Sequence, residues 1–175
     1  LGLRFNAVGT SLSDGRSASA LELGAAWERR LDRRTEATLA AGLGLAEDDT
    51  RSMVLPVAGA GLLHRVPLRG QQLEGGLDLS LAPFVNRFTG TVDQRVIVAA
   101  HLGWGWRDRL LAAFALGTSI ALEGPLQGGS LGTMEATVEY RFQRDLRLVG
   151  GLRGYWDDQP GNRRQLGPFL SLAYR

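Results

Sequence analysis

Large apolar residues alternate with small or charged residues along much of this chain. Leu77, Leu79 and Leu81 interleave with an aspartate, a serine and an alanine, and the same period of two returns at 138–142 and 146–153. Successive side chains of a β-strand point to opposite faces, so this period predicts strands with one apolar face and one polar face.

The alternation extends over the whole chain and divides it into regular segments. It predicts ten strands near 1–10, 17–29, 35–46, 53–64, 73–86, 93–106, 110–122, 131–142, 146–157 and 165–175. Short connections at 29–34, 66–70, 107–109 and 143–145 alternate with longer ones at 11–16, 47–52, 87–91, 123–130 and 158–164. Outer-membrane barrels combine an even strand number with short turns at one end and longer loops at the other. We therefore predict that residues 1–175 form one domain, an antiparallel up-and-down transmembrane β-barrel of about ten strands.

Composition excludes several other classes of protein. No run approaches the roughly 18 uninterrupted apolar residues of a transmembrane helix. The chain has no cysteine, which excludes disulfides and cysteine-based metal sites. Its net charge is only +2 and its arginines are scattered, so we expect no nucleic-acid partner.

If the apolar face points outward, the polar face lines the interior of the barrel. Its charged and polar members are Arg4, Asn6, Glu22, Glu28, Glu36, Thr38, Glu74, Asp78, Ser80, Arg95, His101, Ser119, Glu135, Thr137, Glu139, Arg141, Arg147 and Arg153. Acidic residues dominate the first strands and arginines the last. We therefore expect ion pairs that cross the interior and plug it.

A tight turn at Arg144 makes this expectation specific. It sets Glu139 opposite Val149 and Arg141 opposite Arg147, so the two arginines face each other. Their acids would then come from the second and third strands, because an unpaired charge in a low-dielectric interior costs several kcal/mol.

A soluble barrel of the lipocalin type would show the same alternation with its apolar face turned inward. Glycine and alanine crowd the polar face here, although glycine weakens strands and has little use on a solvent-exposed face. Aromatic residues also gather near strand ends, as in the interfacial girdles of membrane barrels. Those near the short turns are Trp27, Trp104, Trp106, Tyr140, Phe142 and Tyr174, and those near the long loops are Phe84, Phe88, Tyr155 and Trp156. Both observations favour the membrane barrel, and a soluble lipophilic-ligand carrier remains the alternative.

The last strand carries a more specific pattern. Gln165 is followed by Gly167 and then by apolar residues at Leu170 and Leu172, with Tyr174 continuing the series. This segment resembles the C-terminal β-signal of bacterial outer-membrane proteins, with the usual terminal aromatic residue here one position before the end. The resemblance implies an outer-membrane location and recognition by the barrel-assembly machinery. It also implies contact with the lipid bilayer, through lipopolysaccharide or phospholipid, and it assigns no activity.

Some small outer-membrane barrels are enzymes, so the interior needs a search for catalytic groups. His101 and Asp78 lie nearly opposite each other in the predicted sheet, and such a pair is half of a nucleophilic triad. A tight turn sets Ala115 opposite His101, which leaves Ser119 about 13 Å away along its strand. Ser80 is nearer but lies at the wrong depth to reach lipid. We interpret His101 as the partner of an interior hydrogen bond.

Acidic pairs in the long loops are candidates for cation binding. Asp48 and Asp49 form one pair, and Asp157 and Asp158 form another. Neither pair has the spacing of a calcium-binding loop, and paired acids in exposed loops are usually solvated. His64 sits beside a short turn as a rim residue. We assign no catalytic, metal-binding or cofactor-binding residue.

The sequence thus favours a structural or interaction barrel with a plugged polar interior, either alone or as a subunit of a larger envelope complex. Envelope proteins would be its partners through the lipid-facing wall or the rims. The alternatives are a lipid-modifying or proteolytic barrel enzyme and the soluble carrier. The pattern of residues favours a role without catalysis but leaves the question of enzymatic activity open.

Overall fold

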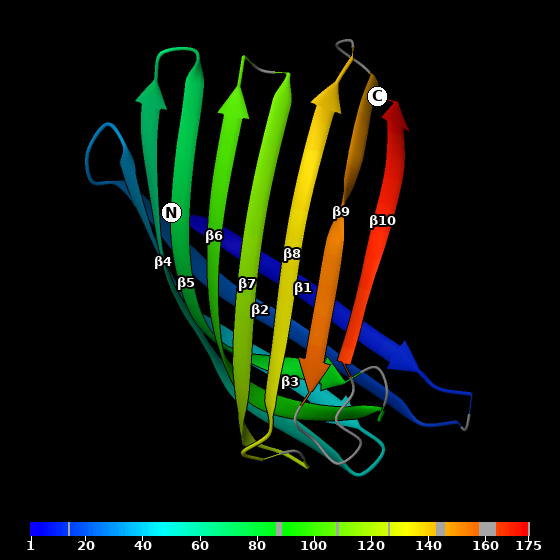
Figure 1. Ribbon diagram of the computed structural model, residues 1–175. Coiled ribbons are helices and arrows are strands. Elements are labelled where there is room, and N and C mark those ends of the chain that lie inside the picture. The colour runs from blue at the N-terminus through cyan, green and yellow to red at the C-terminus, as the bar shows by residue number, and fades with distance from the viewer. Residues whose placement is uncertain are drawn as a thin grey trace.

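The chain folds into one curved antiparallel sheet. A computed structural model describes residues 1–13, 15–86, 89–107, 109–125, 127–142, 146–157 and 164–174. The strands are β1 (Gly2–Ser11), β2 (Ser17–Arg30), β3 (Thr35–Asp48), β4 (Arg51–Leu68), β5 (Gln71–Asn86), β6 (Thr91–Trp106), β7 (Leu110–Glu123), β8 (Ser130–Arg141), β9 (Leu146–Asp157) and β10 (Arg164–Tyr174). They pair in chain order from β1 to β10 (Figure 1). The predicted all-β class, the ten strands and their up-and-down order are confirmed.

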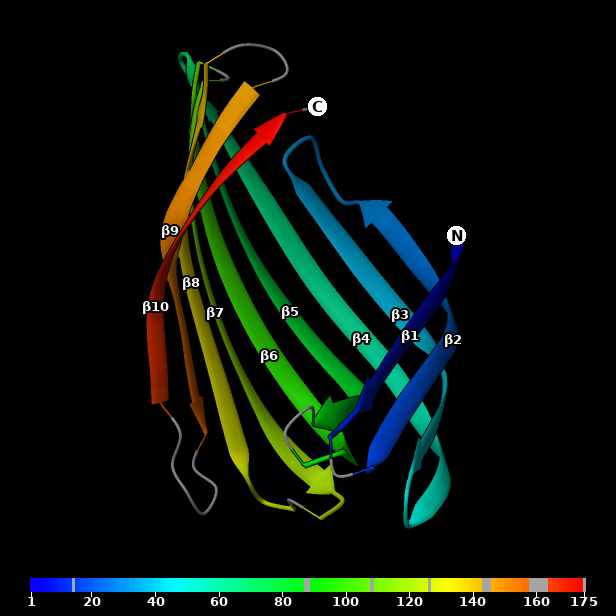
Figure 2. The ribbon, with the colours of Figure 1, turned by 90° about the vertical axis from the view of Figure 1, so that its right-hand side faces the viewer.

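The predicted closure into a barrel is not found. Among the described residues, β1 pairs only with β2 and β10 pairs only with β9. Figure 2 looks into the hollow of the sheet between these two edge strands. A sheet closes only when its edge strands match in tilt and register, and β1 is steeply inclined to β10 (Figure 1). The architecture is therefore an open, strongly curved sheet.

The two ends of the sheet differ largely as predicted, with one exception: β3 and β4 are joined by only Asp49 and Thr50, where a longer connection over 47–52 was predicted. Short turns join β2 to β3, β4 to β5, β6 to β7 and β8 to β9 at one end, which we call the short-turn end. The other connections, most of them longer, lie at the opposite end, which we call the loop end. One predicted turn is shorter in the structure, because β4 continues through Pro67 to Leu68 and leaves only Arg69 and Gly70 to turn the chain. Gly70 has a φ of 70°, a left-handed conformation that glycine adopts without steric cost.

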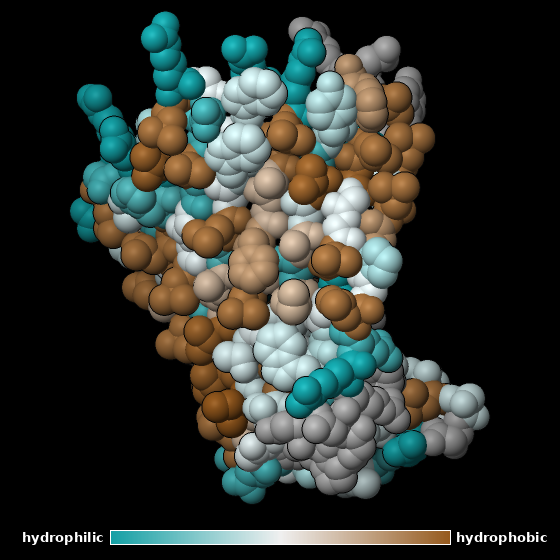
Figure 3. All heavy atoms as spheres, viewed as in Figure 1, coloured by the Kyte–Doolittle hydropathy of each residue, from teal (hydrophilic) through white to brown (hydrophobic). Residues whose placement is uncertain are grey.

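The alternation separates an apolar convex face from a polar concave face. On the convex face, large apolar side chains are exposed, with Leu23 at 61%, Leu102 at 64% and Leu170 at 75% of their full accessibility. Figure 3 shows apolar side chains spread over the strands that face the viewer. Soluble proteins rarely expose apolar surface on this scale.

The buried core sits at the loop end. There the ends of β5 and β6 bend into the hollow of the sheet (Figures 1 and 2). We call residues 83–86 and 91–95 the inturned hairpin. Its buried members include Val85, Asn86, Val92, Asp93, Gln94 and Arg95. Val85 and Val92 pack in one apolar cluster with Ala18, Ala20, Ala46 and Leu55 of β2 to β4. The register between β6 and β7 shifts between Gln94 and Arg95, which is the irregularity that lets β6 bend.

Candidate functional site

The concave face gathers the polar residues that the sequence pattern assigned to one face. The strand registers place them on it together, for example Glu22 opposite Gly44 and Asp78 opposite Gly61. Small partners make room for the charged groups, since a Cβ at Gly61 would lie 2.5 Å from the Asp78 carboxylate. This face lines the hollow in Figure 2 and is the candidate functional site.

Ion pairs on the concave face join neighbouring strands. Arg153 Nε donates to Glu135 Oε2 at 2.8 Å, directly across the β8–β9 pairing. Glu139 accepts from Arg141 Nε at 2.7 Å and from Arg147 Nη1 at 3.3 Å. The registers of Glu139 and Arg141 are those predicted, but the predicted pairing of these arginines across the hollow is wrong. A single carboxylate thus bridges the two arginines and offsets half of their charge.

A second group of charges lies at the short-turn end. Glu36 pairs with Arg65 at 2.9 Å and with Arg30 at 3.3 Å. Nearby, His64 lies within β4 opposite Thr35, rather than beside its own turn as predicted, with its Nδ1 atom 3.0 Å from the Thr35 hydroxyl. These contacts tie β2, β3 and β4 together where the strands end.

The inturned hairpin holds a buried charge network. Arg95 and Asp93 form an ion pair at 3.5 Å, and their side chains are 1% and 0% exposed. The Arg95 guanidinium also donates to the Ser119 hydroxyl at 3.2 Å and lies 5.0 Å from the centre of the Phe84 ring. Gln94 adds a bond from its Nε2 to the Pro56 carbonyl at 2.8 Å. The hairpin is thus attached to β4 and β7 by polar contacts as well as by its apolar core.

Asp48 holds the inturned hairpin to the β3–β4 turn. Its Oδ1 accepts from the Thr50 amide at 3.0 Å and from the Thr50 hydroxyl at 2.6 Å, and its Oδ2 accepts from the Val92 amide at 3.2 Å. Arg51 pairs with the same carboxylate at 3.4 Å and donates to the Val92 carbonyl. These donors occupy the lone pairs that a cation would need, so Asp48 has a structural role.

The other acidic loop residues also have protein partners. Asp49 accepts from the Ser17 amide at 3.2 Å, and the Tyr155 hydroxyl lies 3.5 Å from Asp157. Asp158 lies outside the described residues. Within the described part of the chain, no three histidine, aspartate or glutamate side chains come together as metal ligands would.

The structure does not assemble a triad around His101. Its Nδ1 lies 3.9 Å from Asp78 Oδ2, which is beyond hydrogen-bond distance. His101 is opposite Ala115, as predicted, whereas Ser119 is opposite Ile97 and binds Arg95 instead. His101 therefore has an acidic neighbour but no hydroxyl nucleophile from Ser119.

Cavities in the hollow lie above the inturned hairpin. One of about 390 Å³ is lined by Asn6 and Glu22, by Asn86 of the hairpin and by Tyr155 of β9. A neighbouring cavity of about 270 Å³ adds Arg4 and shares Asn6 and Glu22. Residues of β1 and β9 thus line the same cavity from opposite sides of the hollow.

The aromatic girdles are only partly as predicted. At the short-turn end, Trp27, Trp106, Tyr140 and Phe142 are exposed. At the loop end, however, Phe84 stacks on Arg95 and Tyr155 lines a cavity. These two residues therefore belong to the concave side and not to a lipid-facing girdle. Trp156 lies against Gly132 of β8. Phe88 and the side chain of Tyr174 lie outside what the structure describes.

The described residues contain no helix with the length and apolar character needed to cross a membrane. No curated protein and no solved structure matches this chain. A protein-family model does match it: residues 3–165 fit the EpsX exopolysaccharide export family. Because this match spans nearly the whole chain, the protein belongs to the EpsX exopolysaccharide export family.

Proposed function

We propose that this chain forms part of the wall of a β-barrel in the bacterial outer membrane and serves exopolysaccharide export. The observation that carries the proposal is the division between an apolar convex face and a charged concave face. Lipid is the environment that suits exposed leucines on a curved sheet, and a hydrated polysaccharide suits a polar interior. The family membership favours export over a purely structural role.

A wall inside a membrane must be closed. Lipid offers no hydrogen bonds to a free strand edge, so the outer edges of β1 and β10 need strand partners there. We infer that these edges pair with each other or with additional strands when the protein is in lipid. Leu3 and Phe5 on β1 and Leu170 and Leu172 on β10 then continue the same lipid-facing surface.

The concave face would then line the path of the polysaccharide. Charged side chains and hydroxyl groups exchange hydrogen bonds with sugar hydroxyls as readily as with water. The inturned hairpin narrows this path at the loop end, where Val92, Asp93 and Arg95 are almost fully buried. The obstruction in the interior would therefore be this segment of the chain itself, and not the predicted plug of cross-barrel ion pairs.

Site-specific labelling tests which face meets lipid. The chain contains no cysteine, so a single introduced cysteine is labelled without background. Leu79→Cys and Ser80→Cys place the cysteine at adjacent positions on opposite faces of the sheet. Each variant is labelled with an environment-sensitive fluorophore and reconstituted in lipid vesicles. We expect blue-shifted emission at position 79 and water-like emission at position 80. Water-like emission at both sites, together with recovery as a detergent-free monomer, would indicate a soluble protein and overturn the proposal.

The export role is tested separately in a strain that secretes exopolysaccharide and depends on this protein. Replacing Asp93 and Arg95 together by alanine should loosen the inturned hairpin and change the amount of polysaccharide at the cell surface. Loss of the whole protein should abolish surface polysaccharide while the intracellular polymer remains. Unchanged surface polysaccharide after that loss would contradict an export role.

A further inference from the structure

A set of exposed arginines surrounds the short-turn end. They come from the C-terminal end of β2 and from the turns that follow β2, β4 and β6. We call them the rim arginines: Arg29, Arg33, Arg34, Arg69, Arg107 and Arg109. Each is exposed, and none forms an ion pair with an acidic side chain in the described ranges. Of the acids at this end, Glu36, Glu74 and Glu139 pair with Arg30, Arg65, Arg141 and Arg147. Asp32 accepts from the Arg34 and Thr35 amides within the β2–β3 turn, and Glu28 lies beside Arg29 at the end of β2.

The loop end is more evenly charged. There the half-buried Arg51 pairs with Asp48 and the buried Arg95 pairs with Asp93, while Arg16 and Arg164 are exposed. Exposed acids such as Glu47 and Glu123 lie near the same end. Among the described residues, arginines outnumber acids at the short-turn end, so this end carries a net positive charge.

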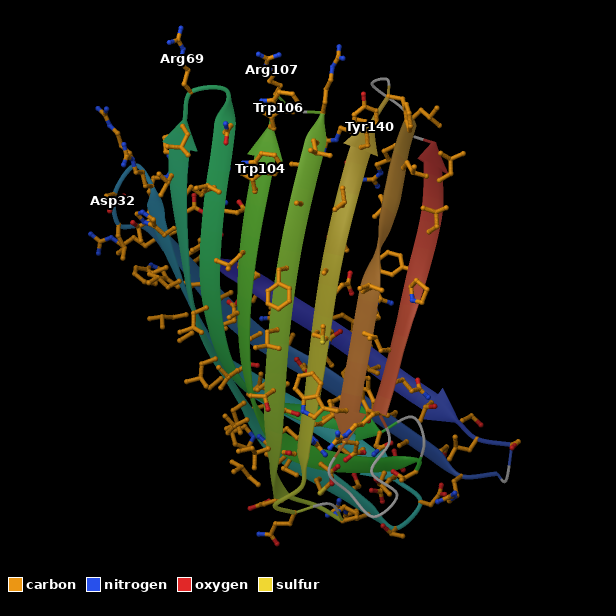
Figure 4. All side chains as sticks on the ribbon, in the orientation of Figure 1. Asp32, Arg69, Trp104, Trp106, Arg107 and Tyr140 are labelled. Atoms are coloured by element: carbon orange, nitrogen blue, oxygen red, sulfur yellow. The ribbon has the colours of Figure 1, made fainter. Side chains whose placement is uncertain are left out.

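Aromatic rings form a belt directly beside the rim arginines. Figure 4 shows Trp104, Trp106 and Tyr140 near the strand ends, with Arg69 and Arg107 projecting beyond them. The Arg107 guanidinium lies 5.1 Å from the centre of the Trp106 ring. Arg107 also has a φ of 48°, so a non-glycine residue occupies the left-handed region at the tip of this turn. Strained backbone of this kind often marks a functional position.

We propose that the rim arginines bind the phosphate groups of anionic phospholipids, so that the short-turn end is anchored in a phospholipid headgroup layer. Tryptophan and tyrosine prefer the membrane interface, which puts the belt just inside that layer and the arginines among the phosphates. The guanidinium group matches phosphate geometry with paired donors. This inference rests on the membrane insertion proposed above and adds a lipid class, an orientation and the residues responsible.

Tryptophan fluorescence quenching by brominated lipids provides the test. Trp104 and Trp106 lie beside the rim and report on the lipids that surround it. The protein is reconstituted in phosphatidylcholine vesicles that contain either brominated phosphatidylglycerol or brominated phosphatidylcholine. Each arginine near an anionic surface contributes about 1 kcal/mol, which is about a fivefold preference for the anionic lipid. The preference should weaken as salt is added.

Matched variants assign the effect to the rim. Arg69→Gln should lower the preference for phosphatidylglycerol about fivefold, and adding Arg107→Gln and Arg109→Gln should lower it further by about the same factor for each arginine removed. Arg164→Gln is the control, because it removes the same charge from an exposed site at the loop end. Equal loss from Arg164→Gln would mean that overall charge, rather than the rim, selects the lipid, and would overturn the proposal.

The remaining outcomes separate this inference from the proposed function. Quenching by both lipids with no preference and no effect of the variants overturns the rim proposal and leaves membrane insertion standing. No quenching by either lipid overturns membrane insertion itself. Polygalacturonate serves as a probe for binding of an anionic polysaccharide. The rim binds polysaccharide instead of lipid if polygalacturonate shifts the tryptophan emission in pure phosphatidylcholine vesicles and the rim variants remove that shift. In that case phosphatidylglycerol has no effect on the emission.

Discussion

Arg153 on β9 lies directly opposite Glu135 on β8, and its Nε donates to the Glu135 carboxylate at 2.8 Å. The two side chains are 68% and 38% exposed. This pair shows how the concave face balances its charges, with neighbouring strands as partners and water in reach. Where neighbouring strands supply the ion-pair partners, the charges need no ion pair across the hollow.

The exposure of this pair predicts a small energetic coupling. Exposed ion pairs contribute roughly 0.2–1 kcal/mol. We expect the double-mutant cycle of Glu135→Gln and Arg153→Gln to give a coupling in that range when unfolding by urea is measured in lipid vesicles. The Glu139→Gln and Arg147→Gln cycle is the comparison on the same strands. A coupling of several kcal/mol would mean that the hollow is dry and that water does not screen the pair.

The buried pair in the inturned hairpin should behave differently. Asp93 and Arg95 are almost inaccessible, and removing one partner of such a pair leaves a buried charge at a cost of about 3–5 kcal/mol. Asp93→Ala should therefore destabilise the protein by about this amount. The double variant Asp93→Ala with Arg95→Met should recover much of the loss, since no charge then remains buried. Unfolding free energies of the single and double variants provide the check, and equal stability of Asp93→Ala and the wild type would contradict it.

Local pattern explains why so much of the sheet could be predicted. Side-chain alternation determines which residues share a face, and short turns determine register. The pairs His101 with Ala115 and Arg141 with Arg147 follow from such turns and are found as predicted. Strand β4 is longer than predicted because Pro67, which suggested a turn, is accommodated within it.

Closure and the inturned hairpin could not be predicted in this way. Closure depends on the tilt and stagger of all the strands together, which no single segment encodes. The hairpin left a weak signal, because Asp93, Gln94 and Arg95 are consecutive polar residues that interrupt the alternation of β6. The ion pairs were misassigned because charge along the sequence shows which groups need partners but not which neighbour is nearest. Glu139 could be recognised as the partner of Arg147 only from the diagonal contact across β8 and β9.

Arginine substitutions on the two faces test which face meets lipid, because their effects on the free energy of unfolding should differ. Leu79 on the convex face is 50% exposed, whereas Ser80 lies on the concave face opposite Gly59 and Ile97. Placing arginine at a lipid-facing position near the bilayer centre costs about 2–4 kcal/mol. We expect Leu79→Arg to reduce the unfolding free energy in vesicles by this amount and Ser80→Arg to reduce it less. The reverse order would show that the concave face is the one that meets lipid.

The β2–β3 turn should respond to acid through Asp32. Its Oδ1 accepts from the Arg34 amide at 2.6 Å and from the Thr35 amide at 2.9 Å, and its Oδ2 accepts from the Thr35 hydroxyl at 2.9 Å. The hydrogen bonds from the Arg34 amide and the Thr35 hydroxyl hold the pKa of Asp32 below its usual value. Because the folded-state pKa is the lower one, the stabilisation is complete above the ordinary aspartate pKa and disappears as the pH falls through the depressed value.

Amide hydrogen exchange measures this dependence at the turn itself. As the pH falls below the usual range of an aspartate, the protection of Arg34 and Thr35, corrected for intrinsic exchange, should decrease while that of central strand amides stays constant. Asp32→Asn keeps the shape of the side chain but not its charge, so its turn should be less protected near neutral pH and insensitive to acid. If the wild-type turn keeps full protection after Asp32 is protonated, the carboxylate does not hold the turn.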